Sequence, residues 1–165
     1  MSKLMVSKAK PNPSGKDRTR HGGASSAQLA GEWCDIKNVS DVRVSLNGVD
    51  LYHHAYSRDG KWEYELVVAL PNEVLGIGET LRVHSGSGPY AVVREEDKVG
   101  AHMNIFTGRD NYVWNNDHGD EALLWYRPEK QRLDAASYDP NPPEGVVLVR
   151  VGDKLVVGSS SYTNR

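Results

Sequence analysis

Short runs in which apolar and polar residues alternate recur along this chain of 165 residues, and turn residues separate them at intervals of about 8–12 residues. Such alternation sends successive side chains to opposite faces of a β-strand. No window of about 11 residues carries apolar side chains at the helical period of 3.6, so the crossover helices that a parallel α/β fold requires are not indicated. We therefore predict an all-β domain built as a β-sandwich. The expected strands are 33–38, 42–46, 49–56, 62–70, 79–84, 132–138, 146–151 and 155–157.

The segment Tyr112–Arg127 is the strongest candidate for the centre of the sheet. Aromatic and branched apolar residues on both sides flank a polar, glycine-containing connection, which is typical of a β-hairpin. In the second half, residues 122–126 are all apolar or aromatic. Both faces of that strand are therefore expected to be buried against other parts of the protein. We therefore predict a hairpin over 112–127 in the middle of the sheet.

The strand expected at 62–70 has a clear two-sided pattern in its first half. One face carries large apolar side chains, namely Trp62, Tyr64, Leu66 and Val68. The other carries Glu63 and Glu65, about 6.6 Å apart at a rise of about 3.3 Å per residue. That separation suits an acid and base pair of the kind that glycosidases use. A solvated strand face produces the same spacing by default, and we favour that interpretation.

Charge is distributed unevenly between the first 31 residues and the rest. Residues 1–31 hold six Lys or Arg and one acid, a net charge of +5, which leaves −7 for the remaining 134 residues. Clusters of Pro, Gly and Ser in this region resist regular structure. We predict a basic arm over 1–31, in which Leu4–Val6 could add one short strand, a sandwich over 32–158 and a polar tail over 159–165.

A basic, flexible arm can hold phosphate backbones by releasing counterions. The candidates for weak, salt-sensitive binding of nucleic acid are Lys8, Lys10, Lys16, Arg18 and Arg20. Terminal segments are commonly charged and solvated, and we favour a solvated tail over a nucleic-acid site.

The single cysteine, Cys34, rules out an intramolecular disulfide and leaves no set of thiolates for zinc. Alternation turns Cys34 inward with Ile36, so we expect an unreactive thiol packed in the core. The longest apolar run is Leu66–Leu70, and no apolar signal-peptide region is visible near the N-terminus. We therefore expect no membrane insertion and a cytoplasmic location, with an extracellular location as the alternative.

Four motifs follow one another along the chain. They are 31–38 (GEWCDIKN), 44–51 (VSLNGVDL), 70–75 (LPNEVL) leading to 78–83 (GETLRV), and 114–124 (WNNDHGDEALL). In this order they resemble the lamin-tail domain family, in its bacterial stand-alone form because no coiled-coil heptads precede the domain. The resemblance spans Glu32–Tyr138 and implies an immunoglobulin-like sandwich, to which the hairpin at 146–157 is an addition. It also implies a non-enzymatic binding or scaffold module with no catalytic residues, and we expect no cofactor.

The loop 115–121 is rich in acidic and amide side chains. Asp117, Asp120 and Glu121 could supply oxygen ligands to calcium, although their spacing does not match the D-x-[DN]-x-[DN]-G loop. Asn and Asp beside Gly are equally what a turn needs, and we favour the turn.

Aromatic residues are the remaining candidates for function. Tyr52, Tyr56, Trp62 and Tyr90 are candidate binding residues, provided that they are exposed and clustered. A protein partner is the first expectation, and DNA held by the basic arm is an alternative. Binding of a glycan would need Trp or Tyr rings that are coplanar on one open face, and a contiguous aromatic patch would favour it.

Overall fold

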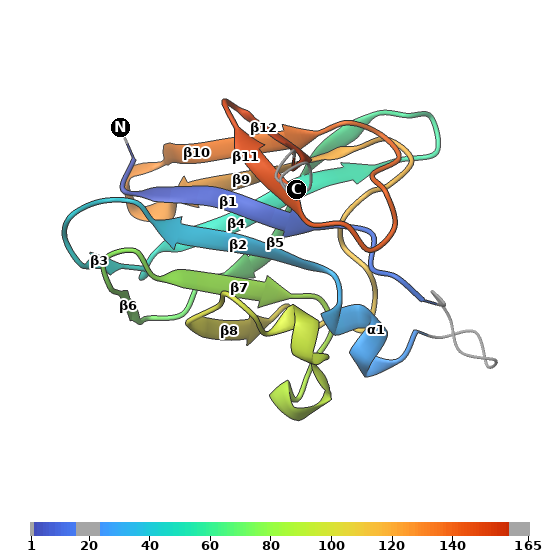
Figure 1. The fold of residues 1–165 in the computed structure, drawn as a ribbon. Coiled ribbons are helices and arrows are strands. Elements are labelled where there is room, and N and C mark those ends of the chain that lie inside the picture. The colour runs from blue at the N-terminus through green and yellow to red at the C-terminus, as the bar shows by residue number, and fades with distance from the viewer. Residues whose placement is uncertain (1, 16–23, 159–165) are drawn as a thin grey trace.

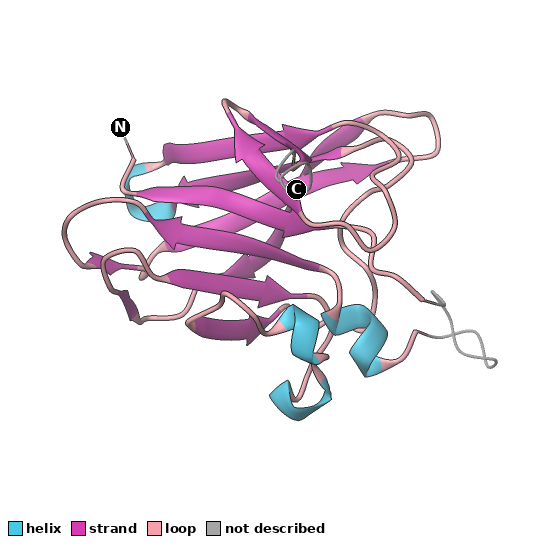
Figure 2. Cartoon of the chain, viewed as in Figure 1, coloured by secondary structure: helices cyan, strands magenta, loops and turns pink. Residues whose placement is uncertain are grey.

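The computed structural model describes residues 2–15 and 24–158. Strands dominate these residues, and a short α-helix and 3₁₀ turns join them (Figure 1, Figure 2). The helical segments are α1 (Ser26–Ala30), η1 (Tyr90–Val92), η2 (Glu95–Asp97) and η3 (Arg127–Glu129). The strands are β1 (Leu4–Lys10), β2 (Trp33–Asn38), β3 (Val44–Ser45), β4 (Val49–Tyr56), β5 (Trp62–Ala69), β6 (Val74–Leu75), β7 (Thr80–His84), β8 (Met103–Phe106), β9 (Asp120–Tyr126), β10 (Gln131–Tyr138), β11 (Leu148–Val151) and β12 (Lys154–Val157).

Ten strands form one continuous sheet in the order β5-β4-β9-β10-β12-β11-β1-β2-β7-β8, while β3 and β6 form a separate pair. Neighbouring strands are antiparallel except where β10 meets β12 and where β7 meets β8. The sheet curls so that β1, β2 and β7 lie in front of β9, β4 and β5 in Figure 1, with the apolar core between them. The predicted all-β class is confirmed, and the finer assignment as an immunoglobulin-like sandwich stays a prediction.

Strand β9 lies in the interior of the sheet, between β4 and β10, as the apolar sequence of 122–126 predicts. Its inward side chains, Ala122 and Leu124, expose 2% and 0% of their surface. The predicted hairpin is wrong in its first half, because residues 112–119 form a loop instead of a strand.

Buried carboxylates explain why that first half is not a strand. The backbone N–H groups of Val113 and Trp114 donate to the carboxylate of Glu32, and the N–H of Asn115 donates to Asp120. These bonds satisfy the backbone donors that would otherwise need a neighbouring strand. The loop is therefore a fixed part of the fold, held by Glu32 from far away in the sequence and by Asp120 from its own end.

Strand β1 corrects the prediction of an arm over 1–31. Residues 4–10, and not only 4–6, lie in the sheet between β11 and β2. A bulge after Val6 moves the next buried apolar position to Ala9, which breaks the strict alternation by which strands were predicted. Further along the same segment, residues 26–30 form α1, capped by the Ser25 hydroxyl.

Two smaller predictions are confirmed. Cys34 and Ile36 are both fully buried, and burial raises the pKa of the Cys34 thiol well above its ordinary value. The C-terminal hairpin forms as β11 and β12, and it is inserted into the sheet between β10 and β1. The predicted tail over 159–165 lies outside the described residues.

Candidate binding surface

Strands β5, β4 and β9 present large aromatic side chains on the outer face of the sheet. Pairing between β4 and β5 aligns Tyr52 with Leu66, His54 with Tyr64, and Tyr56 with Trp62. Residues paired across antiparallel strands point to the same face, and Leu123 of β9 extends that face on the other side of β4. We call this surface the aromatic face, and its members are Tyr52, His54, Tyr56, Trp62, Tyr64, Leu66, Leu123 and Trp125.

Strand β5 is an edge strand whose aromatic side faces solvent. Trp62, Tyr64 and Leu66 expose 44%, 44% and 43% of their surface. A bulge in the pairing with β4 leaves Val67 between the paired residues Leu66 and Val68, and Val67 is buried. Val68 packs against the core, so the apolar face predicted for this strand ends at Leu66.

The rings of the aromatic face pack against one another, one pair stacked and the others at steep angles. The His54 imidazole stacks on the Trp62 indole, with centroids 3.5 Å apart and 10° between the planes. Tyr64 stands edge-on to Trp62 at 78° and to Tyr52 at 79°. The patch is contiguous, but its rings do not form the coplanar platform that glycan binding was expected to need.

Two polar side chains border the rings. The Glu121 carboxylate uses one oxygen, Oε1, both to accept from the Tyr64 hydroxyl and to bond His54 Nε2 at 3.3 Å. Within residues 2–15 and 24–158 nothing bonds its second oxygen, Oε2. Arg132 of β10 is the register partner of Trp125, is exposed, and makes no hydrogen bond or ion pair within the same ranges. The aromatic face therefore has an unused acceptor and an unused donor beside its rings.

Burial and the hydrogen bond to Glu121 raise the pKa of the Tyr64 hydroxyl to about 12. We expect Glu121→Gln to lower the pKa of Tyr64 toward, but not to, the ordinary value of 10. The substitution removes the negative charge of Glu121, but the Tyr64 hydroxyl stays partly buried. NMR titration of the tyrosine ring carbons measures the shift, with Tyr90 as an internal reference that should not move. An unchanged pKa of Tyr64 would contradict the contact between these two side chains.

A shallow hollow of about 310 Å³ opens on the aromatic face. Its lining consists of Tyr52, Tyr64, Leu123 and Trp125, and Leu123 is the most deeply buried of the four. Small-ligand sites usually have volumes of roughly 300–1,000 Å³, so the hollow has room for one small group of a ligand.

A buried polar network joins the three strands beneath the aromatic face. The His53 imidazole lies 3.0 Å from Asp120 and 2.9 Å from Glu65, and it thereby links β4 to β9 and to β5. Burial lowers the pKa of His53, but the bonds to Asp120 and Glu65 outweigh burial and raise it. Asp120 also accepts from the backbone N–H groups of His54, Asn115 and Glu121. The network fixes the spacing of the strands that carry the rings.

The acidic residues predicted as alternative calcium ligands do not converge. Asp120 points into the buried network, whereas Glu121, the next residue, leaves β9 on the aromatic face. Asp117 is exposed on the loop. Among the residues that the structure describes, no group of three His, Cys, Asp or Glu side chains could hold a metal ion. The chain bends at residues 116–118, and Gly119 has a φ of +72°.

The other predicted binding residues lie apart from the aromatic face. Tyr90 is in η1, between β7 and β8, with the Lys98 ammonium 4.7 Å from its ring centroid. Lys10, a candidate phosphate-binding residue, is buried, and its ammonium is already paired with Asp97 at 2.6 Å. Lys8 is exposed on β1. Three further predicted cations lie outside the described residues, namely Lys16, Arg18 and Arg20.

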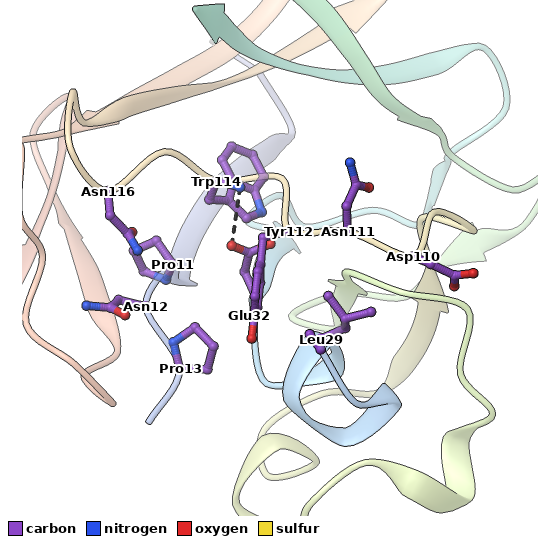
Figure 3. A pocket seen from close by; sticks show the side chains of 11 residues that line it. Pro11, Asn12, Pro13, Leu29, Glu32, Asp110, Asn111, Tyr112, Trp114 and Asn116 are labelled. Carbon is purple, nitrogen blue, oxygen red and sulfur yellow. Dashed lines mark hydrogen bonds between the residues drawn. The ribbon is translucent and has the colours of Figure 1, made fainter. Parts of the chain in front are cut away.

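A second hollow, of about 420 Å³, lies between the chain that follows β1, helix α1 and the loop before β9 (Figure 3). Its lining includes Pro11, Pro13, Leu29, Glu32, Tyr112 and Trp114. Burial raises the pKa of the Glu32 carboxyl to about 8, although the Ser85 hydroxyl and two backbone N–H groups donate to it. Because these donors occupy its oxygens, Glu32 acts as an anchor for the loop. Sequence reasoning missed it, since a single Glu before a strand carries no signal.

No protein-family model and no curated protein matches the chain. Within the described part of the chain, no helix is long and apolar enough to cross a membrane.

Proposed function

We propose that this protein is a non-enzymatic module that binds another macromolecule through the aromatic face. The observation that carries the proposal is the contiguous exposure of Trp62, Tyr64 and Leu66 on the outer side of β5. Burying apolar surface stabilises a protein by about 25 cal/mol per Å², so apolar surface left in water loses that stabilisation. Contiguous exposed apolar patches therefore mark interaction sites. Trp and Tyr are also enriched among the residues that dominate binding interfaces.

The ligand lies on the face of the sheet and not along the open edge of β5. Arg109 donates to the backbone carbonyls of Leu66 and Val67 and so covers part of that edge. Glu63 and Glu65 point to the other side of the strand, and an antiparallel second copy of β5 would bring these like charges together. Both features oppose strand addition by another copy of the chain.

The resemblance to lamin-tail domains supports a binding role, because domains of that family act by engaging proteins and nucleic acid. Nucleic-acid binding through the N-terminal segment is the weaker alternative here. Of the predicted phosphate-binding cations that the structure describes, Lys10 is occupied by Asp97 and only Lys8 is exposed. One exposed lysine gives little of the counterion release on which such binding depends.

The double variant Trp62→Ala/Tyr64→Ala is expected to abolish capture of macromolecules by the immobilised protein. Both residues lie on an exposed edge strand, so the fold should survive, as circular dichroism and thermal unfolding would check. The measurement compares what the wild type and the variant retain from a native extract at physiological salt, with proteins and glycans identified separately.

Tyr90→Ala is the matched control, because Tyr90 is a 47% exposed aromatic residue outside the aromatic face. It should retain the same molecules as the wild type. Equal retention by the wild type and the double variant would contradict the proposal.

A further inference from the structure

The outer half of the β4–β5 hairpin extends beyond the strand that pairs with its inner half. Pairing between β4 and β9 ends at Tyr52, whereas pairing between β4 and β5 continues as far as Tyr56 and Trp62. Within the described chain, residues 53–65 therefore have no strand ladder that joins them to the body of the sheet. We call residues 53–65 the hairpin tip. Four rings of the aromatic face belong to it, those of His54, Tyr56, Trp62 and Tyr64.

Asp120, the first residue of β9, holds the hairpin tip in place of a ladder. Its carboxylate accepts from the backbone N–H of His54 and bonds Nδ1 of the His53 imidazole at 3.0 Å. On the opposite side of the same ring, Nε2 lies 2.9 Å from the carboxylate of Glu65 in β5. The side chains of His53 and Asp120 are only 5% and 0% exposed. The ring of His53 therefore links β9, β4 and β5 in a place that is largely closed to water.

The two hydrogen bonds of this ring determine its charge. A neutral imidazole carries one N–H, whereas an ionised carboxylate only accepts hydrogen bonds. Four backbone and amide N–H groups donate to Asp120 besides His53, so its oxygens act as acceptors. Glu65 is half exposed, and its carboxylate faces the guanidinium of Arg109 at 3.6 Å. Because both neighbours of the ring are acceptors, both ring nitrogens must carry hydrogen, and His53 is an imidazolium ion.

The charged groups around His53 come from three separate elements. They are Asp120 of β9, Glu65 of β5 and Arg109, which follows β8 and pairs with Glu65. Burial lowers the pKa of His53, but Asp120 and Glu65 together outweigh burial and raise it above 6.5. Other titratable groups that act on Asp120 are uncharged at neutral pH because burial raises their pKa values, namely Glu32, Tyr56 and Tyr138.

Loss of the ring proton leaves one N–H for two acceptors. The remaining hydrogen stays on Nδ1, because Asp120 is fully buried, whereas Glu65 can turn toward water and Arg109. The lone pair on Nε2 then repels the Glu65 carboxylate, and Asp120 loses the positive charge that offsets its burial. Asn115 and Glu121 still bond the tip. The hairpin tip is therefore loosened but stays attached.

From this geometry we propose that His53 is a protonation switch for the aromatic face. The charged ring holds the hairpin tip in the arrangement that binds, and deprotonation at alkaline pH releases Glu65 and loosens the rings. The inference rests on the proposed function of the same face and adds its regulation. Because folding raises the pKa of His53 above 6.5, its stabilising effect is complete below pH 6.5 and is lost as the pH rises through the folded-state pKa.

NMR spectroscopy of the full chain, labelled with ¹⁵N at histidine, tests the charge of the ring. At pH 7 both ring nitrogens of His53 should carry hydrogen, and the titration should give a pKa above 6.5. His102 is the internal reference, because its Nδ1 accepts from the backbone N–H of Thr80 and should carry no hydrogen. A single N–H on the His53 ring at pH 7 would overturn the inference.

Hydrogen exchange tests whether the proton holds the hairpin tip. After correction for intrinsic rates, protection of amides in 53–56 and 62–66 should fall about tenfold per pH unit between 6.5 and the folded-state pKa of His53. Glu65→Gln should make this fall shallower, because the Gln amide can donate to the neutral Nε2. Glu63→Gln, the matched control on the same face of β5, should follow the wild type. All three proteins keep Glu32, so its effect on the whole fold cancels in the comparison.

Two outcomes of these experiments would contradict the switch. The first is an equal fall in protection for the wild type and Glu65→Gln. The second is the expected exchange result together with wild-type capture through the aromatic face that stays constant over the same pH range. The NMR and exchange measurements need no ligand. If the switch fails but capture still depends on Trp62 and Tyr64, the proposed function stands and only its regulation is wrong.

Discussion

Replacing Asp120 by alanine is expected to lower the free energy of unfolding by about 3–5 kcal/mol, the usual cost of breaking a buried ion pair. The Asp120 carboxylate is buried, and five nitrogen groups bond it. Its removal leaves the His53 imidazole and three backbone N–H groups without their acceptor. Each unsatisfied buried donor costs about 1–3 kcal/mol, and local water entry recovers part of the sum.

Urea unfolding at pH 7 measures this loss, and Asp117→Ala is its control. Asp117 belongs to the same loop but is exposed, so its replacement should change the free energy of unfolding by less than about 0.5 kcal/mol. Asp120→Asn keeps one acceptor oxygen and should show an intermediate loss. A variant Asp120→Ala within about 1 kcal/mol of the wild type would mean that the network does not support β4, β5 and β9.

Features of the fold that depend on neighbours in sequence could be predicted. The expected strands at 33–38 and 49–56 coincide with β2 and β4, because period-two alternation decides which side chains enter the core. Tyr52, Tyr56, Trp62 and Tyr90 were candidate binding residues because they are aromatic, and Tyr52, Tyr56 and Trp62 lie on neighbouring strands. The structure brings these three together on one face.

Features that depend on contacts between distant residues could not be predicted. The extent of β1 was missed because a bulge breaks its alternation, and the loop at 112–119 was taken for a strand because Glu32 supplies its acceptor from 81 and 82 positions away. The roles of His54 and Glu121 depend on the register between β4, β5 and β9. Sequence alone does not determine this register, because β9 is apolar on both of its faces and either face could be turned toward the core.

Glu32 is expected to make the stability of the wild type fall as the pH rises from about 4.5 to about 8. Its carboxyl has a pKa of about 8 in the folded protein, above the ordinary value of 4.5. In this pH range the folded state therefore keeps a proton that the unfolded state has released, so raising the pH favours unfolding. Each unit of pKa difference corresponds to about 1.4 kcal/mol, which gives a loss on the order of 3–5 kcal/mol that levels off above pH 8.

Glu32→Gln isolates this contribution, because the amide has nearly the same shape as the carboxyl and does not titrate. Its oxygen can still accept from the Ser85 hydroxyl and from the Val113 N–H, which both bond Oε1 of Glu32 in the wild type. Chemical unfolding of both proteins at pH 5, 6.5 and 8 should show the variant gaining stability relative to the wild type with each step. The exposed replacement Glu63→Gln should follow the wild-type profile. Parallel profiles for Glu32→Gln and the wild type would mean that Glu32 is already ionised in the folded protein at pH 5, held by its three donors in spite of burial.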